Sequence, residues 1–202
     1  MLLSVAHPGE GRGGGEERVM ASEFQRRKVA TVFEAMDADG RGHLVAADFE
    51  ALAARWTRLR GQRPGTETHA KLRAIMLGWW LSLSAAAEYA DRVSLDDVLT
   101  VVDALPAMTE AVAATADAMF EAVDENVDGR VSRAEYRRMI EAWNGRATDT
   151  DEVFDLLDLD GDGAITVDEF RLLWTEFWAG DDPAAPGTWV FGRFDLPLGQ
   201  TV

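Results

Sequence analysis

Two twelve-residue segments limit the possible folds of this chain more than any other feature. Residues 124–135 read DENVDGRVSRAE and residues 158–169 read DLDGDGAITVDE, so the two segments start 34 residues apart. Both place Asp or Asn at positions one, three and five, Gly at position six, an apolar residue at position eight and Glu at position twelve. A polar turn at a helix start needs only a few of these positions. The repeat therefore indicates two copies of one structural unit.

The oxygen-bearing groups in both segments have the chemistry that Ca²⁺ requires, which is six to eight oxygen ligands at about 2.3–2.6 Å. Positions one, three and five offer side-chain oxygens, position seven its main-chain carbonyl, position nine a water-binding hydroxyl and position twelve two carboxylate oxygens. The predicted ligands are Asp124, Asn126, Asp128, Arg130, Ser132 and Glu135 in the first segment, and Asp158, Asp160, Asp162, Ala164, Thr166 and Glu169 in the second. Two Ca²⁺ sites are expected, with Mg²⁺ as a competitor.

The remaining positions have structural roles. Glycine at position six permits a sharp turn that a Cβ atom would strain. The position-nine hydroxyl is also a helix N-cap, and the apolar residues Val131 and Ile165 fit a short β-bridge that would couple the two sites. Only the carbonyl of position seven binds metal, so we expect the side chain of Arg130 to have no effect on binding.

Helical patterns surround these segments. Ser22 is the first predicted N-cap, with Gln25 as its capping-box partner. The Gly- and Pro-containing run RGQRPGTET indicates a loop. Apolar residues at helical spacing predict helices within residues 24–36, 49–56, 67–85, 94–105, 109–123, 133–143, 150–157 and 167–178.

A third segment, residues 37–48, reads DADGRGHLVAAD. Asp37, Asp39 and Asp48 stand at ligand positions, and His43 would offer its carbonyl. Position five is Arg41, which brings a positive charge where an oxygen belongs. Two interpretations stay open: a weakened site for Ca²⁺ or Mg²⁺, or an empty loop in which Arg41 pairs with an aspartate.

The chain resembles the EF-hand family, and within it calerythrin and the sarcoplasmic calcium-binding proteins. The resemblance runs from about residue 22 to the C-terminus, and rests on the two loops, on the Asp that closes residues 37–48, and on the tail FGRFDLPLG. It implies four helix–loop–helix hands in a compact body, of which the second typically binds no metal. By register the second loop is residues 86–97, AAEYADRVSLDD, where Ala86, Ala90 and Asp91 replace ligands and the turn glycine. Val93 can still bridge to Leu44, and Ser94 can still cap the next helix.

We therefore expect an all-α protein with two paired lobes. Residues 22–105 would form the N-terminal pair and residues 109–180 the C-terminal pair. Residues 1–21 are Gly-rich and charged, which is typical of a disordered lead. Residues 181–202 would form a tail packed on the body. Residues 37–48, 86–97, 124–135 and 158–169 are named loops 1, 2, 3 and 4.

Charge and composition limit the kinds of partner that this chain can bind. The net charge is −16, of which residues 1–105 carry −2 and residues 106–202 carry −14. Such a surface is a poor partner for nucleic acid and a natural one for cations. There is no cysteine, and no apolar run approaches the roughly 20 residues of a membrane helix. We expect a cytoplasmic monomer that binds no membrane, and 18 Arg against 2 Lys suggest a GC-rich bacterial genome.

Other residues weighed for function are better explained by structure. The seven Trp could line a cofactor cavity, but their helical spacing is more typical of a core. Three His give no support for a Ser–His–Asp site, so no enzyme is expected. The expected function is that of a calcium buffer or transport protein of calerythrin type. The alternative is a sensor that exposes an apolar groove to a protein target.

Overall fold

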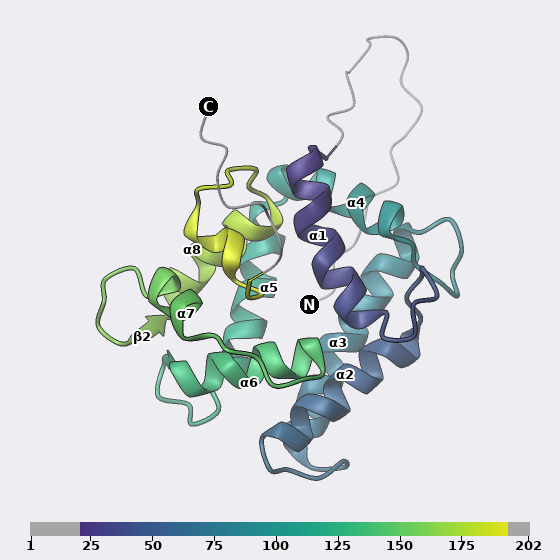
Figure 1. Cartoon of the computed structure of the whole chain (residues 1–202). Helices are drawn as coiled ribbons and strands as arrows, with labels where there is room; N and C mark the ends of the chain where they lie inside the picture. The colour runs from purple at the N-terminus through teal and green to yellow at the C-terminus, as the bar shows by residue number, and fades with distance from the viewer. Residues whose placement is uncertain (1–20, 194–202) are drawn as a thin grey trace.

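The chain forms helix–loop–helix units, and the computed structural model describes residues 21–193 of it (Figure 1). The α-helices are α1 (Glu23–Met36), α2 (Ala46–Leu59), α3 (Glu67–Ala86), α4 (Leu95–Ala104), α5 (Thr109–Val123), α6 (Arg133–Asn144), α7 (Asp151–Leu157) and α8 (Val167–Trp178). Two short 3₁₀ helices are η1 (Leu105–Ala107) and η2 (Pro186–Trp189). The expected all-α class is confirmed. The disordered lead predicted for residues 1–21 and the end of the predicted tail, residues 194–202, lie outside the described residues, except for Ala21.

Short polar side chains start the helices where the sequence predicts. Ser22 accepts a hydrogen bond from the Gln25 amide at 3.0 Å, and Ser94, Ser132 and Thr166 cap α4, α6 and α8 in the same way. The capping-box role predicted for the Gln25 side chain is wrong. Its amide group is buried and donates instead to the carbonyl oxygens of Phe177 and Trp178, which lack helical partners at the end of α8.

Loops are joined in pairs by main-chain bridges. β1 (Arg130–Ser132) of loop 3 runs antiparallel to β2 (Ala164–Thr166) of loop 4, with Val131 opposite Ile165. In the other pair, Leu44 and Val93 exchange main-chain hydrogen bonds of 2.8 and 2.9 Å. Both bridges were predicted and are confirmed. The bridging residues are almost fully buried, so each pair of loops is fixed to the core beneath it.

The helices of both halves share one hydrophobic core. α2 packs on α3 within its own half and on α6 of the other half, and α5 packs on α8. Trp56 of α2 and Trp143 of α6 are among the largest fully buried side chains. The proposed division into lobes 22–105 and 109–180 stays a prediction, because the core is continuous across it.

An aromatic cluster, formed by Trp79, Trp143, Trp174, Trp178 and Phe191, joins α3, α6, α8 and the segment after η2. The Trp79 ring centroid lies 5.9 Å from that of Trp143 and 5.7 Å from that of Trp174. Phe191, beyond the last helix, lies 4.8 Å from Trp143 and is buried. The described part of the tail therefore packs on the body through its aromatic side chain.

Next to this cluster lies an apolar cavity of about 110 Å³ between α3, α4, α5 and α8. Trp79, Trp174 and Trp178 form part of its wall.

Two of the lining segments, Leu95–Ala107 and Thr109–Val123, meet the length and hydropathy requirements of a membrane span only as a pair bent by 110°. No single helix of the described chain meets them.

Lys28 is a buried cation on α1 that holds the end of α8. Its side chain is 0 % exposed, and Nζ donates to the carbonyl oxygens of Glu176 at 3.1 Å and Gly180 at 2.9 Å. Nζ also lies over the Phe24 and Phe177 rings. Burial lowers the pKa of Lys28 from 10.5 to about 8, although the charges of Asp181 and Glu176 oppose this shift.

This shift predicts a rise in stability with pH. Between pH 8 and 10.5 the unfolded chain keeps a Lys28 proton that the folded protein has lost, so unfolding becomes less favourable as pH rises. The contribution should grow by up to about 3 kcal/mol across this window. Urea unfolding of wild type and Lys28→Met at several pH values measures it. A difference between the two proteins that does not change with pH would contradict the shift.

Candidate metal centre

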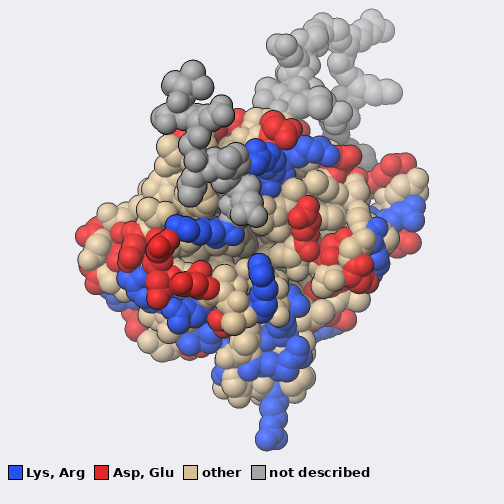
Figure 2. Space-filling model, in the orientation of Figure 1, with Lys and Arg blue, Asp and Glu red and all other residues tan. Residues whose placement is uncertain are grey.

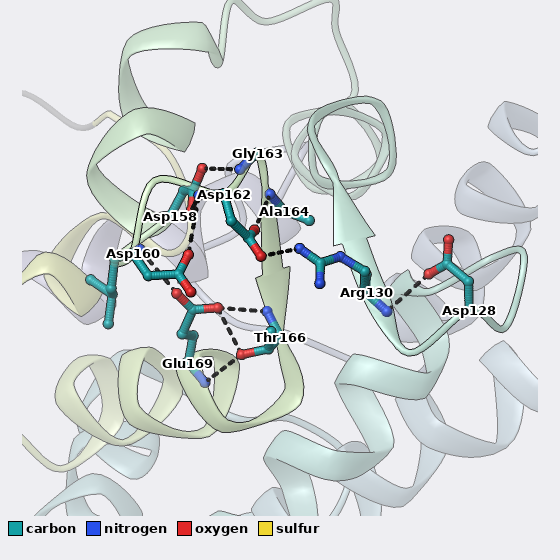
Figure 3. A network of polar contacts seen from close by, with 10 residues as sticks. Asp128, Arg130, Asp158, Asp160, Asp162, Gly163, Ala164, Thr166 and Glu169 are labelled. Carbon is teal, nitrogen blue, oxygen red and sulfur yellow. Dashed lines mark hydrogen bonds and ion pairs between the residues drawn. The ribbon is translucent and has the colours of Figure 1, made fainter.

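Loops 3 and 4 lie side by side at one end of the C-terminal helices, joined by β1 and β2 (Figure 3). The first residues of the two loops, Asp124 and Asp158, are the C-cap residues that directly follow α5 and α7. α6 and α8 start inside the loops and carry the last predicted ligands, Glu135 and Glu169. The predicted ligand sets are thus brought together from both sides of each loop.

In loop 4, three carboxylates converge on one point. One oxygen from each of Asp158, Asp160 and Asp162 lies within 4.8 Å of the other two. Main-chain N–H groups of the loop hold them there: Asp158 accepts from Asp162 and Gly163 at 3.1 and 2.8 Å. Three negative charges this close repel one another, so the cluster favours a small cation of high charge.

Glu169 completes loop 4 from the first turn of α8. Its Oε2 accepts from the main-chain N–H and the hydroxyl of Thr166, both at 2.7 Å, and its Oε1 accepts from the Leu159 N–H at 3.1 Å. Burial by itself would raise the pKa of Glu169. The hydrogen bonds from Thr166 and Leu159 outweigh it and hold the pKa below its ordinary value, so the carboxylate stays ionised at neutral pH.

Loop 3 repeats this arrangement. Asp124 accepts from the N–H groups of Asp128 and Gly129 at 3.2 and 2.9 Å. Glu135 Oε2 accepts from the Ser132 N–H and hydroxyl at 2.8 and 2.6 Å, and its Oε1 accepts from the Glu125 N–H at 2.9 Å. The same contacts at the same loop positions show that the repeat in the sequence is a repeat in geometry.

The N-terminal half also contacts loop 3, through a residue that the sequence analysis did not single out. Glu125 Oε1 lies 2.8 Å from Arg138 Nε and 3.2 Å from Arg60 Nε, and Arg60 comes from the end of α2. Burial lowers the pKa of Arg60, and the charge of Glu125 opposes that shift. Nothing in the spacing of residues 58–63 indicates this contact, because it depends on how α2 packs against α6.

Both loops use left-handed backbone at positions four and six. Gly129 and Gly163 have φ of +79° and +91°, as the sequence pattern requires. Position four is Gly161 in loop 4 but Val127 in loop 3, with φ of +58°. A β-branched residue is strained in this region, so the backbone of loop 3 is more strained at this turn than that of loop 4.

The side chain of Arg130 contacts the neighbouring loop. Its guanidinium crosses to loop 4 and pairs with Asp162 Oδ2 (Figure 3), and the role of the Arg130 carbonyl as a ligand stays a prediction. The hydrogen bond and charge of Arg130 hold the pKa of Asp162 below its ordinary value. The β1–β2 pairing carries Arg130 to the neighbouring loop, and the expectation that this side chain has no effect on binding stays a prediction.

Loop 1 keeps the main-chain geometry of loops 3 and 4. Asp37 accepts from the N–H groups of Arg41 and Gly42 at 3.0 and 2.7 Å, and Asp48 accepts from the Val45 N–H at 2.8 Å. The difference lies in the Arg41 guanidinium. Nε lies 2.6 Å from Asp39 Oδ1, and Nη2 lies 2.6 and 2.7 Å from the two Asp48 oxygens. The structure has the arginine–aspartate pairing of the second interpretation, and the expectation that loop 1 is empty stays a prediction.

Loop 2 has a different path. Ala86 at its first position still belongs to α3, and Tyr89 and Asp91 lack the left-handed backbone found at the same positions of the other loops. Asp97 at its last position accepts from the N–H groups of Glu88 and Ser94 at 3.2 and 2.8 Å. Among the described residues, loop 2 has no converging set of three carboxylates, and its expected lack of metal binding stays a prediction.

Charge is unevenly spread over the surface. Figure 2 shows acidic side chains gathered on the side where α7 and β2 lie, and basic side chains gathered over the turn between α2 and α3. Loop 4 lies on the side of α7 and β2, and the same view shows acidic side chains on the opposite edge as well. Such a field attracts cations toward the loops from a distance.

Comparison with known proteins identifies the class of these loops. Residues 114–175, which include loops 3 and 4, match the EF-hand domain pair. This segment of the chain is therefore similar to an EF-hand pair, which agrees with the geometry of its loops.

The whole chain resembles the sarcoplasmic calcium-binding proteins. The chain is 24 % identical to the alpha chain of the sarcoplasmic calcium-binding protein of Penaeus vannamei over 190 residues. The alignment covers 86 % of this chain and 97 % of that protein. The chain is 27 % identical to sarcoplasmic calcium-binding protein 1 of Astacus leptodactylus, covering 77 % and 88 %. The coelenterazine-binding protein of Renilla muelleri shares the fold, with a TM-score of 0.66 and 22 % identity over 85 % of this chain and 99 % of that one.

The contacts of Arg41 predict that loop 1 can be converted into a binding loop. In Arg41→Asp an anionic ligand replaces the guanidinium, and Asp39 and Asp48 become free to face a cation. Calorimetric titration with Ca²⁺ should count two strong sites in wild type and three in Arg41→Asp, with at least a tenfold gain in affinity at loop 1. Arg92→Asp is the matched control, because it makes the same charge change in loop 2 and should leave the count at two. Three strong sites in wild type, or two in Arg41→Asp, would contradict the prediction.

Proposed function

We propose that this protein binds two Ca²⁺ ions reversibly, in loops 3 and 4, and acts as a calcium buffer. The observation that carries the proposal is the convergence of three carboxylates in loop 4, together with loop 3, which repeats its hydrogen bonds and is joined to it by β1 and β2. Calcium is a hard cation that prefers such oxygen sets. The relatives named above are called calcium-binding proteins, which supports this choice of ion. Mg²⁺ would compete weakly, because a bidentate Glu suits calcium's larger coordination sphere.

The buried state of the methionines favours a buffer over a sensor. Calcium sensors open a Met-rich groove that adapts to its targets. Here four of the five methionines in the described part of the chain are buried, namely Met36, Met76, Met119 and Met139. Large exposed apolar side chains such as Leu81, Leu156 and Leu172 stand on three different helices. Single exposed residues of this kind do not make a docking groove.

The shared core gives a second reason. Opening a groove by moving α8 away from α3 and α5 would separate Trp174 of α8 from Trp79 of α3, which belongs to the other half of the chain. Aromatic pairs of this kind contribute about 0.5–1.5 kcal/mol each beyond their buried area. The apolar cavity of about 110 Å³ is also smaller than the roughly 300–1,000 Å³ of drug-sized ligand sites, so it does not favour a large bound cofactor.

Removing one carboxylate from each loop tests the calcium sites. Glu135→Gln and Glu169→Gln should each abolish one strong site in calorimetric titration, and the double variant should lose both. A Gln cannot supply two anionic oxygens, although it can still accept hydrogen bonds from the loop. Glu110→Gln, an exposed residue in the first turn of α5, is the control for net charge and should leave two sites. Unchanged stoichiometry in the double variant would refute the assignment.

A hydrophobic dye separates the buffer from the sensor. A buffer should show little change in dye fluorescence when Ca²⁺ is added, because its apolar side chains stay covered. A severalfold rise on calcium binding, reversed by a chelator, would support the sensor instead.

A further inference from the structure

We propose that Arg130 is a tethered competitor for the calcium site of loop 4. This inference rests on the proposed function and concerns its regulation. The guanidinium of Arg130 is bound to Asp162, which is predicted to ligate the ion. Calcium must displace this side chain before Asp162 can turn its oxygen to the metal.

The position of Arg130 follows from the pairing of the loops. Arg130 is the first residue of β1, and its partner in the register is Thr166 of β2. A side chain at this point extends from loop 3 toward loop 4, where Asp162 Oδ2 meets it. Asp162 also accepts from the Ala164 N–H at 3.1 Å through its other oxygen. The main-chain N–H holds the carboxylate in place, whereas the guanidinium on Oδ2 is a cation, so an ion that approaches Asp162 must compete with Arg130.

The corresponding carboxylate of loop 3 has different partners. Asp128 accepts from the Asn126 amide at 2.7 Å and from the Arg130 N–H at 2.9 Å. These donors belong to loop 3 itself and are neutral, whereas the donor on Asp162 is a cation from the neighbouring loop. Arg130 thus contributes to both sites, offering its carbonyl to loop 3 and its guanidinium to loop 4. Competition by a cation is expected at loop 4.

The Arg130–Asp162 ion pair is partly exposed to solvent, so it can open and close reversibly. The side chains of Arg130 and Asp162 are 43 % and 38 % exposed, so water screens their attraction. Exposed ion pairs of this strength favour the closed arrangement only a few times over the open one. Affinity falls in proportion to the fraction of molecules in the open, binding-competent state, so removing the competitor should tighten binding about two- to sixfold.

The test uses a protein in which only loop 4 is competent. Glu135→Gln disables loop 3, and Arg130→Gln is added to it. Calorimetry should give a dissociation constant for Ca²⁺ about two to six times lower in the double variant. Stopped-flow measurements should assign the change to faster association. The dissociation rate should stay the same, because in the loaded site the guanidinium has already left Asp162.

Arg133→Gln in the same background is the matched control. Arg133 lies three residues further on with a similar exposure of 40 %, and it pairs with Asp155, which is not a predicted ligand. If Arg130→Gln and Arg133→Gln tighten calcium binding equally, the effect comes from the change in net charge alone and the inference is wrong. Unchanged or weaker binding in the Arg130→Gln protein would overturn it as well. If Glu135→Gln alone leaves no calcium bound, the assignment of loop 4 fails and the inference fails with it.

Discussion

Repulsion among crowded carboxylates is the constraint on which the loops of this protein depend. Oxygens such as those of Asp158, Asp160 and Asp162 must be held within 4.8 Å of one another against their own charge. The chain meets this requirement in two ways. N–H groups of the turns donate to the carboxylates, and arginine side chains supply positive charge. The left-handed glycines make the first way possible, because they turn successive N–H groups toward the centre of the loop.

The three loops that keep this geometry differ in where their positive charge comes from. In loop 1 it is internal, since Arg41 binds Asp39 and Asp48 of the same loop. In loop 4 it comes from the neighbouring loop through Arg130. In loop 3 the described contacts to Asp128 come from neutral donors. The same structural unit thus differs from loop to loop in the source of the positive charge that contacts its carboxylates.

The sequence predicted the helices, the bridges and the residues of the loops, because these depend on local spacing. The bounds of α5 and α8 agree with the apolar pattern, and the pairs Val131–Ile165 and Leu44–Val93 follow from loop register. Contacts between distant segments could not be predicted. Gln25 binds the end of α8 and Arg60 reaches loop 3 only because tertiary packing places them there. The role of each predicted ligand stays a prediction, because coordination depends on the ion as well as on the loop.

The aromatic cluster has a consequence for how light is absorbed and emitted by this molecule. The Trp79 ring lies 5.9, 5.7 and 6.5 Å from the rings of Trp143, Trp174 and Trp178. Indole rings at these separations exchange excitation energy faster than they emit it. Light absorbed by Trp79 of α3 can therefore be emitted by a ring of α6 or α8 in the other half of the chain. The fluorescence of these indoles reports the contact between the two halves as well as the surroundings of each ring.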